Sequence, residues 1–207
     1  MLTPGQLSGG FSFASASIIA GMFDASFIQA METVFEHEGG FVDDPVDPGG
    51  ATNFGVSLRF LVSIGELDLD DDGIMDGDFN YDGKVDVQDI KDMDREDAMK
   101  LYHLHWWDKY GYGDLPAGIA VKVFDLAVNM GAKQAHKLLQ RACRATGANL
   151  TEDGIIGPQT RFVIQGLDQW GLMTALRSEA AGFYRVLIAQ KPHFEKYRNG
   201  WLRRAYA

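Results

Sequence analysis

Three polar residues near the front of the chain have the types and the spacing that carboxylate chemistry needs. Glu38 closes a predicted helix, Asp47 follows nine residues later and Thr52 fourteen residues later. Residues 41–57 are dense in Asp, Pro and Gly, which is typical of turns and hairpins. A helix that ends in Glu, followed by such a hairpin, can place three polar groups around one cleft. Glycosidic hydrolysis uses a protonated carboxyl group at the leaving oxygen and a second group that holds water or stabilises positive charge.

Helical periodicity distinguishes Glu38 from its neighbour Glu36. The predicted helix has Asp24 as its N-cap and stops at Gly39 and Gly40. Glu38 falls within the apolar stripe of this helix, whereas Glu36 falls on the opposite face. Burial raises the pKa of a carboxyl group, and a general acid must still hold its proton near neutral pH. Helical phase alone leaves an alternative open, in which Glu38 is a helix-end residue in water.

The elements that must position these residues are mainly helical. Apolar spacing and end signals predict helices at residues 58–65, 87–102, 119–130 (buried and central), 133–146, from Pro158 onward, and at 171–190. We therefore predict a mainly α fold with a small Gly/Asp/Pro-rich hairpin. One domain spans residues 24–207, with a helical half from about residue 115, and an arm at residues 1–23 precedes it.

The segment around Glu38 also carries a family resemblance. It resembles the signature of glycoside hydrolase family 108, the N-acetylmuramidases of phage endolysins, in the stretch HEGGFVDDPVDPGGATNFGVSLRFL. The likeness continues in order through YHLHWWDKY, LPAGIAVKVFDLAVNMG, LLQRACRATG, DGIIGPQT and FEKYRNGWLRRA. It implies a lysozyme-like α-helical fold with Glu38 as catalytic acid. The spacing is also similar to the Glu, Asp and Thr triad of phage lysozymes, with a one-residue difference at Thr, which implies Asp47 and Thr52 as catalytic partners.

This resemblance implies peptidoglycan as the partner. The reaction it implies is hydrolysis of the β-1,4 bond between N-acetylmuramic acid and N-acetylglucosamine, and the helical half at about 115–207 would have a peptidoglycan-binding role. Two alternatives stay open: a non-catalytic peptidoglycan-binding or secretion/assembly protein on the same fold, and a chitinase-like glycosidase. The presence of Glu38, Asp47 and Thr52 together favours the enzyme.

Four further residues are candidates for substrate binding. Asn53 follows Thr52 directly, and Trp107 offers a ring that could stack on a sugar face. Asp125 and Asn129 are four residues apart, so they share one face of an otherwise apolar helix. We expect Asp125 and Asn129 to line the cleft, with capping of a neighbouring loop as the alternative.

An acidic insert at residues 66–97 contains a calcium-loop pattern. The stretch DFNYDGKVDVQD at 78–89 has oxygen-bearing residues at the positions of an EF-hand loop, around a Gly turn. The expected ligands are Asp78, Asn80, Asp82, the carbonyl of Lys84, Asp86 and Asp89. An upstream repeat with Phe79 in its twelfth position predicts a second, incomplete Ca²⁺ site at Asp68, Asp70, Asp72 and Asp76. His103 and His105 indicate metal binding only weakly, because no third His or Cys accompanies them.

The charge distribution limits the class of partner. The net charge is −10, but residues 66–97 hold 14 acidic and 3 basic residues, whereas residues 98–207 hold 15 basic and 8 acidic residues. A basic body suits an anionic polymer. No nucleic-acid motif is recognisable, so we expect no nucleic-acid partner.

The same composition bears on the compartment. A single cysteine, Cys143, allows no intrachain disulfide, and no apolar run is long enough for a stable membrane span. We expect a monomer that is made in the host cytoplasm and acts in the periplasm or cell wall, through a holin or with help from the N-terminal segment.

Overall fold

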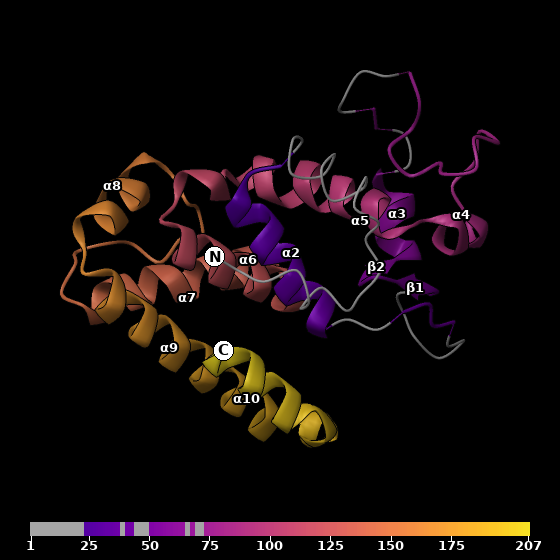
Figure 1. The fold of residues 1–207 in the computed structure, drawn as a ribbon. Helices are drawn as coiled ribbons and strands as arrows, with labels where there is room; N and C mark the ends of the chain where they lie inside the picture. The colour runs from indigo at the N-terminus through magenta and orange to yellow at the C-terminus, as the bar shows by residue number, and fades with distance from the viewer. Residues whose placement is uncertain (1–22, 38–39, 44–49, 65–66, 69–72) are drawn as a thin grey trace, which may run out of the picture.

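The computed structural model describes residues 23–37, 40–43, 50–64, 67–68 and 73–207. Within these residues the chain is mainly helical with one short hairpin, which confirms the predicted class (Figure 1). The α-helices are α2 Ala25–His37, α3 Leu58–Ile64, α4 Val87–Asp92, α5 Arg95–Tyr102, α6 Ala117–Met130, α7 Ala132–Ala145, α8 Pro158–Gly166, α9 Gln169–Gln190 and α10 Arg198–Tyr206. A π-helical segment, His103–Asp108, continues α5, and 3-10 turns occupy Tyr112–Asp114 and Pro192–Tyr197.

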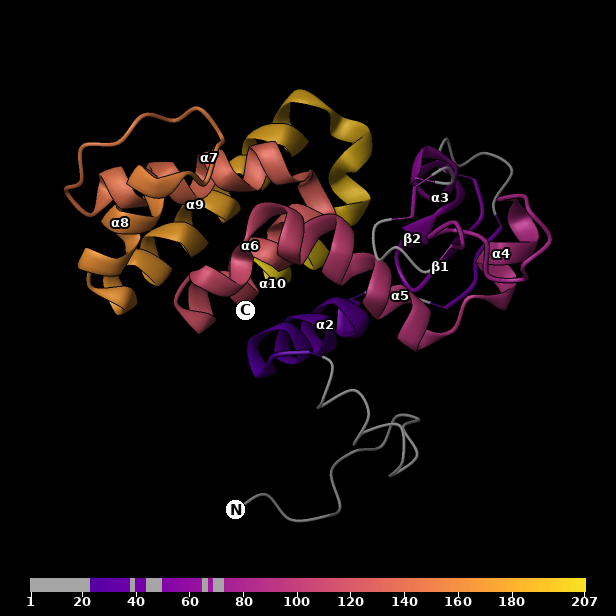
Figure 2. The same cartoon turned by 90° about the horizontal axis from the view of Figure 1, so that it is seen from above.

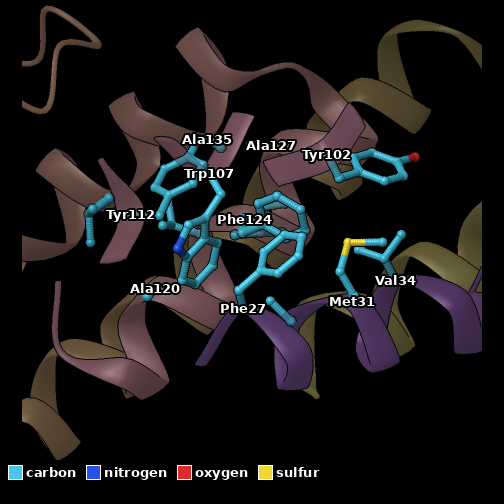
Figure 3. Packing of buried hydrophobic residues seen from close by; sticks show 14 of the residues in the cluster. Phe27, Met31, Val34, Tyr102, Trp107, Tyr112, Ala120, Phe124, Ala127 and Ala135 are labelled. Atoms are coloured by element: carbon cyan, nitrogen blue, oxygen red, sulfur yellow. The ribbon is translucent and has the colours of Figure 1, made fainter. Parts of the chain in front are cut away.

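Helix α6 is the centre of the helical body. It is apolar nearly all round, so helices can pack on several of its sides, and both α2 and α7 do so. Figure 3 shows the Phe27 ring of α2 next to Phe124 of α6, with Met31 and Val34 pointing from α2 toward the side on which Tyr102 lies. Phe27 and Phe124 are both fully buried, with ring centroids 6.1 Å apart. The predicted central helix is therefore confirmed.

Helix α2 begins where the sequence predicts. The Asp24 carboxylate accepts hydrogen bonds from the backbone N–H groups of Ser26 and Phe27, at 2.8 and 2.9 Å. These bonds satisfy two of the donors that a helix start leaves unpaired. Glu36 is exposed, as the helical phase predicted.

A small lobe lies at one end of the body, beyond α5 (Figure 2). It consists of α3, α4 and an antiparallel hairpin of β1 Thr52–Asn53 and β2 Val56–Ser57, in which Thr52 pairs with Ser57. An additional bridge pairs Val42 with Thr52. The predicted hairpin is thus present in the described part of residues 41–57.

The single helix predicted at residues 87–102 is wrong. The chain forms α4 and α5 instead, separated at Met93 and Asp94. Asp94 accepts hydrogen bonds from the N–H groups of Glu96 and Asp97, and Asp97 bonds back to the N–H of Asp94. This capping box starts a new helix, and its Asp–x–x–Asp spacing was readable in the sequence.

None of the helices in the described ranges combines the length and the apolar character that a bilayer crossing requires.

Candidate active site

The two carboxylates of the predicted catalytic set, Glu38 and Asp47, lie outside the described residues. The structure describes the elements on both sides of them. Glu38 follows directly on His37, the last residue of α2. Asp47 belongs to the segment between Val42 and Thr52, whose backbones pair at 2.8 Å in both directions. Asp47 is therefore carried by a segment whose two ends meet in one β-bridge.

Thr52 occupies a defined place in this frame. Its backbone pairs with both Val42 and Ser57, so Thr52 lies between the incoming chain and β2. Its side chain is half-buried, and its hydroxyl donates to the carbonyl oxygen of Gly50 at 3.3 Å. A hydroxyl has two lone pairs, so the oxygen of Thr52 retains acceptor capacity.

The proposed substrate contact of Asn53 is contradicted. Asn53 is only 7% exposed, and its amide nitrogen donates to the carbonyl oxygens of Ile90 at 3.0 Å and Met93 at 3.2 Å. These carbonyls lie at the end of α4, where a helix leaves acceptors unpaired. Asn53 therefore fastens the hairpin to α4.

The hairpin turn is held against the helices by aromatic contacts that the sequence analysis missed. Phe54 has a positive φ of 49°, and Gly55 follows with φ 80°. A non-glycine residue in that region needs support from its surroundings. The Phe54 ring contacts the Phe35 ring of α2 at 5.8 Å, and the hydroxyl of Tyr102 donates to the Phe54 carbonyl oxygen at 3.4 Å. These contacts fix the hairpin relative to the end of α2.

The sugar-stacking role predicted for Trp107 is also contradicted. Its side chain is 2% exposed, and its indole N–H donates to the Asp24 carboxylate at 3.1 Å. The ring packs against Phe27 and Phe124, with centroids at 5.3 and 5.5 Å. Trp107 therefore joins the start of α2 to the core and has no face open to a ligand.

Asp125 and Asn129 share a helix face but not an environment. Asp125 is 1% exposed, and its carboxylate lies 3.3 Å from Nε of Arg204 in α10. Asn129 is exposed, and its side-chain oxygen accepts a hydrogen bond from the Tyr184 hydroxyl at 2.7 Å. Asp125 is thus an interior ion-pair residue, which contradicts its predicted place in a cleft. Asn129 remains accessible near the end of α6.

A buried lysine beside Asp125 was missed by the sequence analysis. Lys122 is 5% exposed, and its ammonium group donates to the backbone carbonyl oxygen of Arg204. Burial lowers the pKa of Lys122 to about 8, although the nearby Asp125 carboxylate opposes this shift. Lys122, Asp125 and Arg204 together attach α10 to α6 by polar contacts inside the body.

The predicted calcium loop, residues 78–89, is closed by its own side chains. The Asp78 carboxylate accepts from the N–H groups of Asp82 and Gly83, at 3.1 and 2.8 Å. The Asp89 carboxylate accepts from the N–H groups of Phe79 and Asp86, at 3.0 and 2.7 Å. Asp78 is 5% exposed and Asp89 is fully buried, so both carboxylates at the ends of the loop lie in the interior.

Of the upstream repeat, Asp70 and Asp72 lie outside the described residues. The Asp68 carboxylate accepts from the N–H of Gly73 at 2.9 Å, as Asp78 does from Gly83. Asp76 has a different partner: its carboxylate lies 3.0 Å from Nε2 of His105, and both side chains are 3% exposed. Burial lowers the pKa of His105, against the opposing effect of Asp76.

The pair of Asp76 and His105 attaches the acidic insert to the π-helical segment. His103 is likewise paired, with Asp108 at 3.0 Å. Over the described ranges, no group of three or more His, Cys, Asp or Glu side chains is arranged as a metal site.

Comparison with known proteins divides the chain into two matched segments. Residues 31–131 match the family model described as Glycosyl hydrolase 108, and residues 134–206 match the model described as Predicted Peptidoglycan domain. The first segment contains the α2 end, the hairpin, the acidic insert and α6. The second contains most of α7 and all of α8 to α10.

A solved structure, described as "Structure of Brucella abortus SagA", is similar to this chain. The sequence identity is 28% and the TM-score is 0.65, over 87% of this chain and 89% of that chain. Among the curated proteins, the comparison finds no match. The two family matches and this likeness support a mainly α, lysozyme-like fold, with similarity to glycosyl hydrolase 108 in the first segment and to a predicted peptidoglycan domain in the second.

Proposed function

We propose that this protein is an N-acetylmuramidase of the endolysin type. It hydrolyses the β-1,4 bond between N-acetylmuramic acid and N-acetylglucosamine in peptidoglycan, with Glu38 as general acid. The observation that carries the proposal is the match of residues 31–131 to the glycosyl hydrolase 108 model, because that range includes the Glu38-Gly39-Gly40 motif.

The described frame supports this assignment of Glu38. The apolar stripe that predicts Glu38 at the edge of the core consists of residues that are in fact buried: Phe27, Met31 and Val34. Glu36, on the opposite face, is exposed. A carboxyl group next to buried apolar side chains keeps its proton to a higher pH, which is what a general acid requires.

For activation of the attacking water we propose Asp47 and Thr52. Asp47 acts as the base that takes a proton from water, and Thr52 orients that water through its hydroxyl. The water oxygen then attacks the anomeric carbon while Glu38 gives its proton to the leaving oxygen, so the configuration inverts. This route needs the two carboxyl groups about 6.5–9.5 Å apart. The pairing of Thr52 with Val42 supports it, since Thr52 lies where the segment carrying Asp47 closes.

We also propose that the loop at residues 78–89 binds Ca²⁺ through the predicted ligands. Oxygen donors at this spacing are of the type that a hard cation takes. Within the described chain neither Asp78 nor Asp89 has a salt-bridge partner, yet both are buried. Buried carboxylates are costly unless a positive charge compensates them. The ion would supply that charge, and its role is structural.

Product analysis tests the enzymatic proposal. Purified peptidoglycan is digested with the protein, the fragments are reduced with borohydride, and the reducing-end sugar is identified by mass spectrometry. A muramidase leaves N-acetylmuramic acid at the reducing end. Reducing-end N-acetylglucosamine would show a different bond specificity. Binding without any released fragment would favour the non-catalytic alternative, and cleavage of chitin in preference to peptidoglycan would favour the chitinase-like one.

The same two family matches support the cell wall as the site of action. For its route there, we propose synthesis in the cytoplasm and passage through a holin or with help from the N-terminal segment, and we propose a monomer.

A further inference from the structure

The second matched segment exposes aromatic side chains that the core does not use. Phe162 is 78% exposed and Trp170 is 77% exposed. Phe162 lies on α8 between the buried positions Thr160 and Ile164, so it points away from the core. Trp170 lies in the first turn of α9. Large apolar side chains in such positions cost solubility and mark contact surfaces when they gather at one place.

A groove lies beside Phe162. Its volume is about 500 Å³, and Phe162 and Leu167 form part of its apolar lining. Two exposed carboxamide side chains, Asn149 and Gln165, also line it. The groove is thus apolar with a few uncharged donors and acceptors, which is the composition of a binding site for a neutral ligand.

The start of α9 lies close to the end of α7, and residues next to both of these ends line the groove. The Asp168 carboxylate accepts from the N–H of Gly171 at 2.7 Å and so begins α9 directly after the groove residue Leu167. A Cβ placed on Gly171 would lie 4.0 Å from the methyl carbon of Thr146, two residues before Ala148 in the groove lining. Trp170 follows the groove residue Leu167 by three residues, and its side chain is exposed at the start of α9.

We propose that this surface, defined as Phe162, Trp170, Asn149 and Gln165, binds the glycan strand of peptidoglycan outside the hydrolytic site. The aromatic faces would cover sugar rings, and the two carboxamides would bond to their N-acetyl groups. The inference rests on the proposed substrate and names the place where the second segment holds it.

Charge supports this occupant over an apolar protein partner. Residues 134–207 contain eleven Lys and Arg against five Asp and Glu, a net charge of +6. Peptidoglycan carries free carboxylates on its stem peptides, so the net positive charge of this segment attracts the polymer, while the uncharged groove receives its sugars. The segment is also the one that matches the predicted peptidoglycan domain.

Co-sedimentation with purified insoluble peptidoglycan tests the surface, in a Glu38→Gln background that prevents digestion. The double variant Phe162→Ala/Trp170→Ala is expected to bind at least about 10-fold more weakly, which corresponds to about 1.4 kcal/mol. Trp170→Phe keeps a ring and should bind nearly as the parent does. Tyr81→Ala is the matched control, since Tyr81 is 72% exposed but lies in the acidic insert. An unchanged melting temperature of each variant confirms that the fold is intact.

The ligand class is tested with soluble probes. A hexamer of N-acetylglucosamine should shift the indole N–H signal of Trp170 in NMR spectra, assigned by its loss in Trp170→Phe, whereas a free stem peptide should not. Equal wall binding by the double variant and its parent would overturn the proposal. A shift caused by the peptide and not by the hexamer would overturn it as well. Normal binding with a wrong cleavage product would defeat the proposed hydrolytic function and leave this surface standing.

Discussion

The helical body and the small lobe are stabilised in different ways. The body is built around α6, where Phe27, Trp107 and Phe124 meet in the interior. The small lobe contains the hairpin and α4, and its described contacts include side chains that bond to backbone groups, such as Asn53 on the end of α4. Apolar burial is non-directional, whereas each polar contact fixes one distance. The lobe can therefore position catalytic groups, and the body supplies most of the stability.

The largest effect should follow from Phe124→Ala, because the change leaves a cavity at the centre of the body. We expect a loss of about 3–5 kcal/mol in the free energy of unfolding, measured by urea denaturation. Phe162→Ala is the matched control, since the same substitution at a side chain that is 78% exposed should change stability very little. Equal losses in the two variants would show that the body is not held by this core.

Calcium bound at the loop of residues 78–89 should stabilise the protein by less than the Phe124 side chain does. At a Ca²⁺ concentration 100-fold above Kd, binding adds about 2.7 kcal/mol. EGTA should therefore lower the melting temperature more than it lowers activity at mild temperature. Asp82→Asn should remove the response to Ca²⁺, whereas Asp92→Asn, an exposed change outside the loop, should keep it. A wild-type melting temperature that ignores Ca²⁺ would remove the metal from this account.

Asn53→Ala tests the polar link between the hairpin and α4. Two buried carbonyl oxygens lose their donor, and this should cost about 1–3 kcal/mol. Hydrolysis should fall as well, because the strand that carries Thr52 loses an attachment. Gln88→Ala in α4 removes an exposed hydrogen bond to Asp92 and serves as the control. If Asn53→Ala lowered wall binding without any loss of stability, Asn53 would be a substrate ligand after all.

The smallest effect concerns a titrating group in the body. Burial lowers the pKa of His136, whose Nδ1–H donates to the Gly154 carbonyl oxygen while Nε2 accepts from the Tyr112 hydroxyl. Below about pH 6.5 this histidine binds a proton in the unfolded chain, whereas burial disfavours protonation in the folded protein. The contribution of neutral His136 to the free energy of unfolding is therefore fully present above that pH. It falls as the pH decreases, by at most about 1.4 kcal/mol per pH unit. His136→Gln should show a flatter profile of unfolding free energy between pH 7.5 and 5.5, and an unchanged slope would refute the assignment.

The sequence predicted the secondary-structure elements better than it predicted the contact partners of individual side chains. The apolar run of α6 and the Asp24 cap are local signals, and both are confirmed. Asp125 was misplaced because its partner, Arg204, lies far along the chain and no local pattern reveals it. Trp107 shows the same limit, since an aromatic residue looks alike in sequence whether it covers a sugar or packs on Phe124.

In the candidate site, too, local features could be predicted from the sequence, whereas tertiary contacts could not. The hairpin and the exposure of Glu36 were predictable from turn residues and helical phase. Thr52 is found in the predicted hairpin, whereas the roles of Glu38 and Asp47 stay predictions. The support of Phe54 by Phe35 and Tyr102 depends on tertiary packing, which spacing along the chain does not encode.

The most direct test of the central claim compares two glutamates that are two residues apart. Glu38→Gln and Glu36→Gln are purified, their melting temperatures are matched to the wild type, and their release of reducing ends from purified peptidoglycan is measured. If Glu38 is the general acid, Glu38→Gln loses essentially all hydrolysis, while Glu36→Gln keeps nearly the wild-type rate. An active Glu38→Gln protein, or a Glu36→Gln protein that is the inactive one, would contradict it.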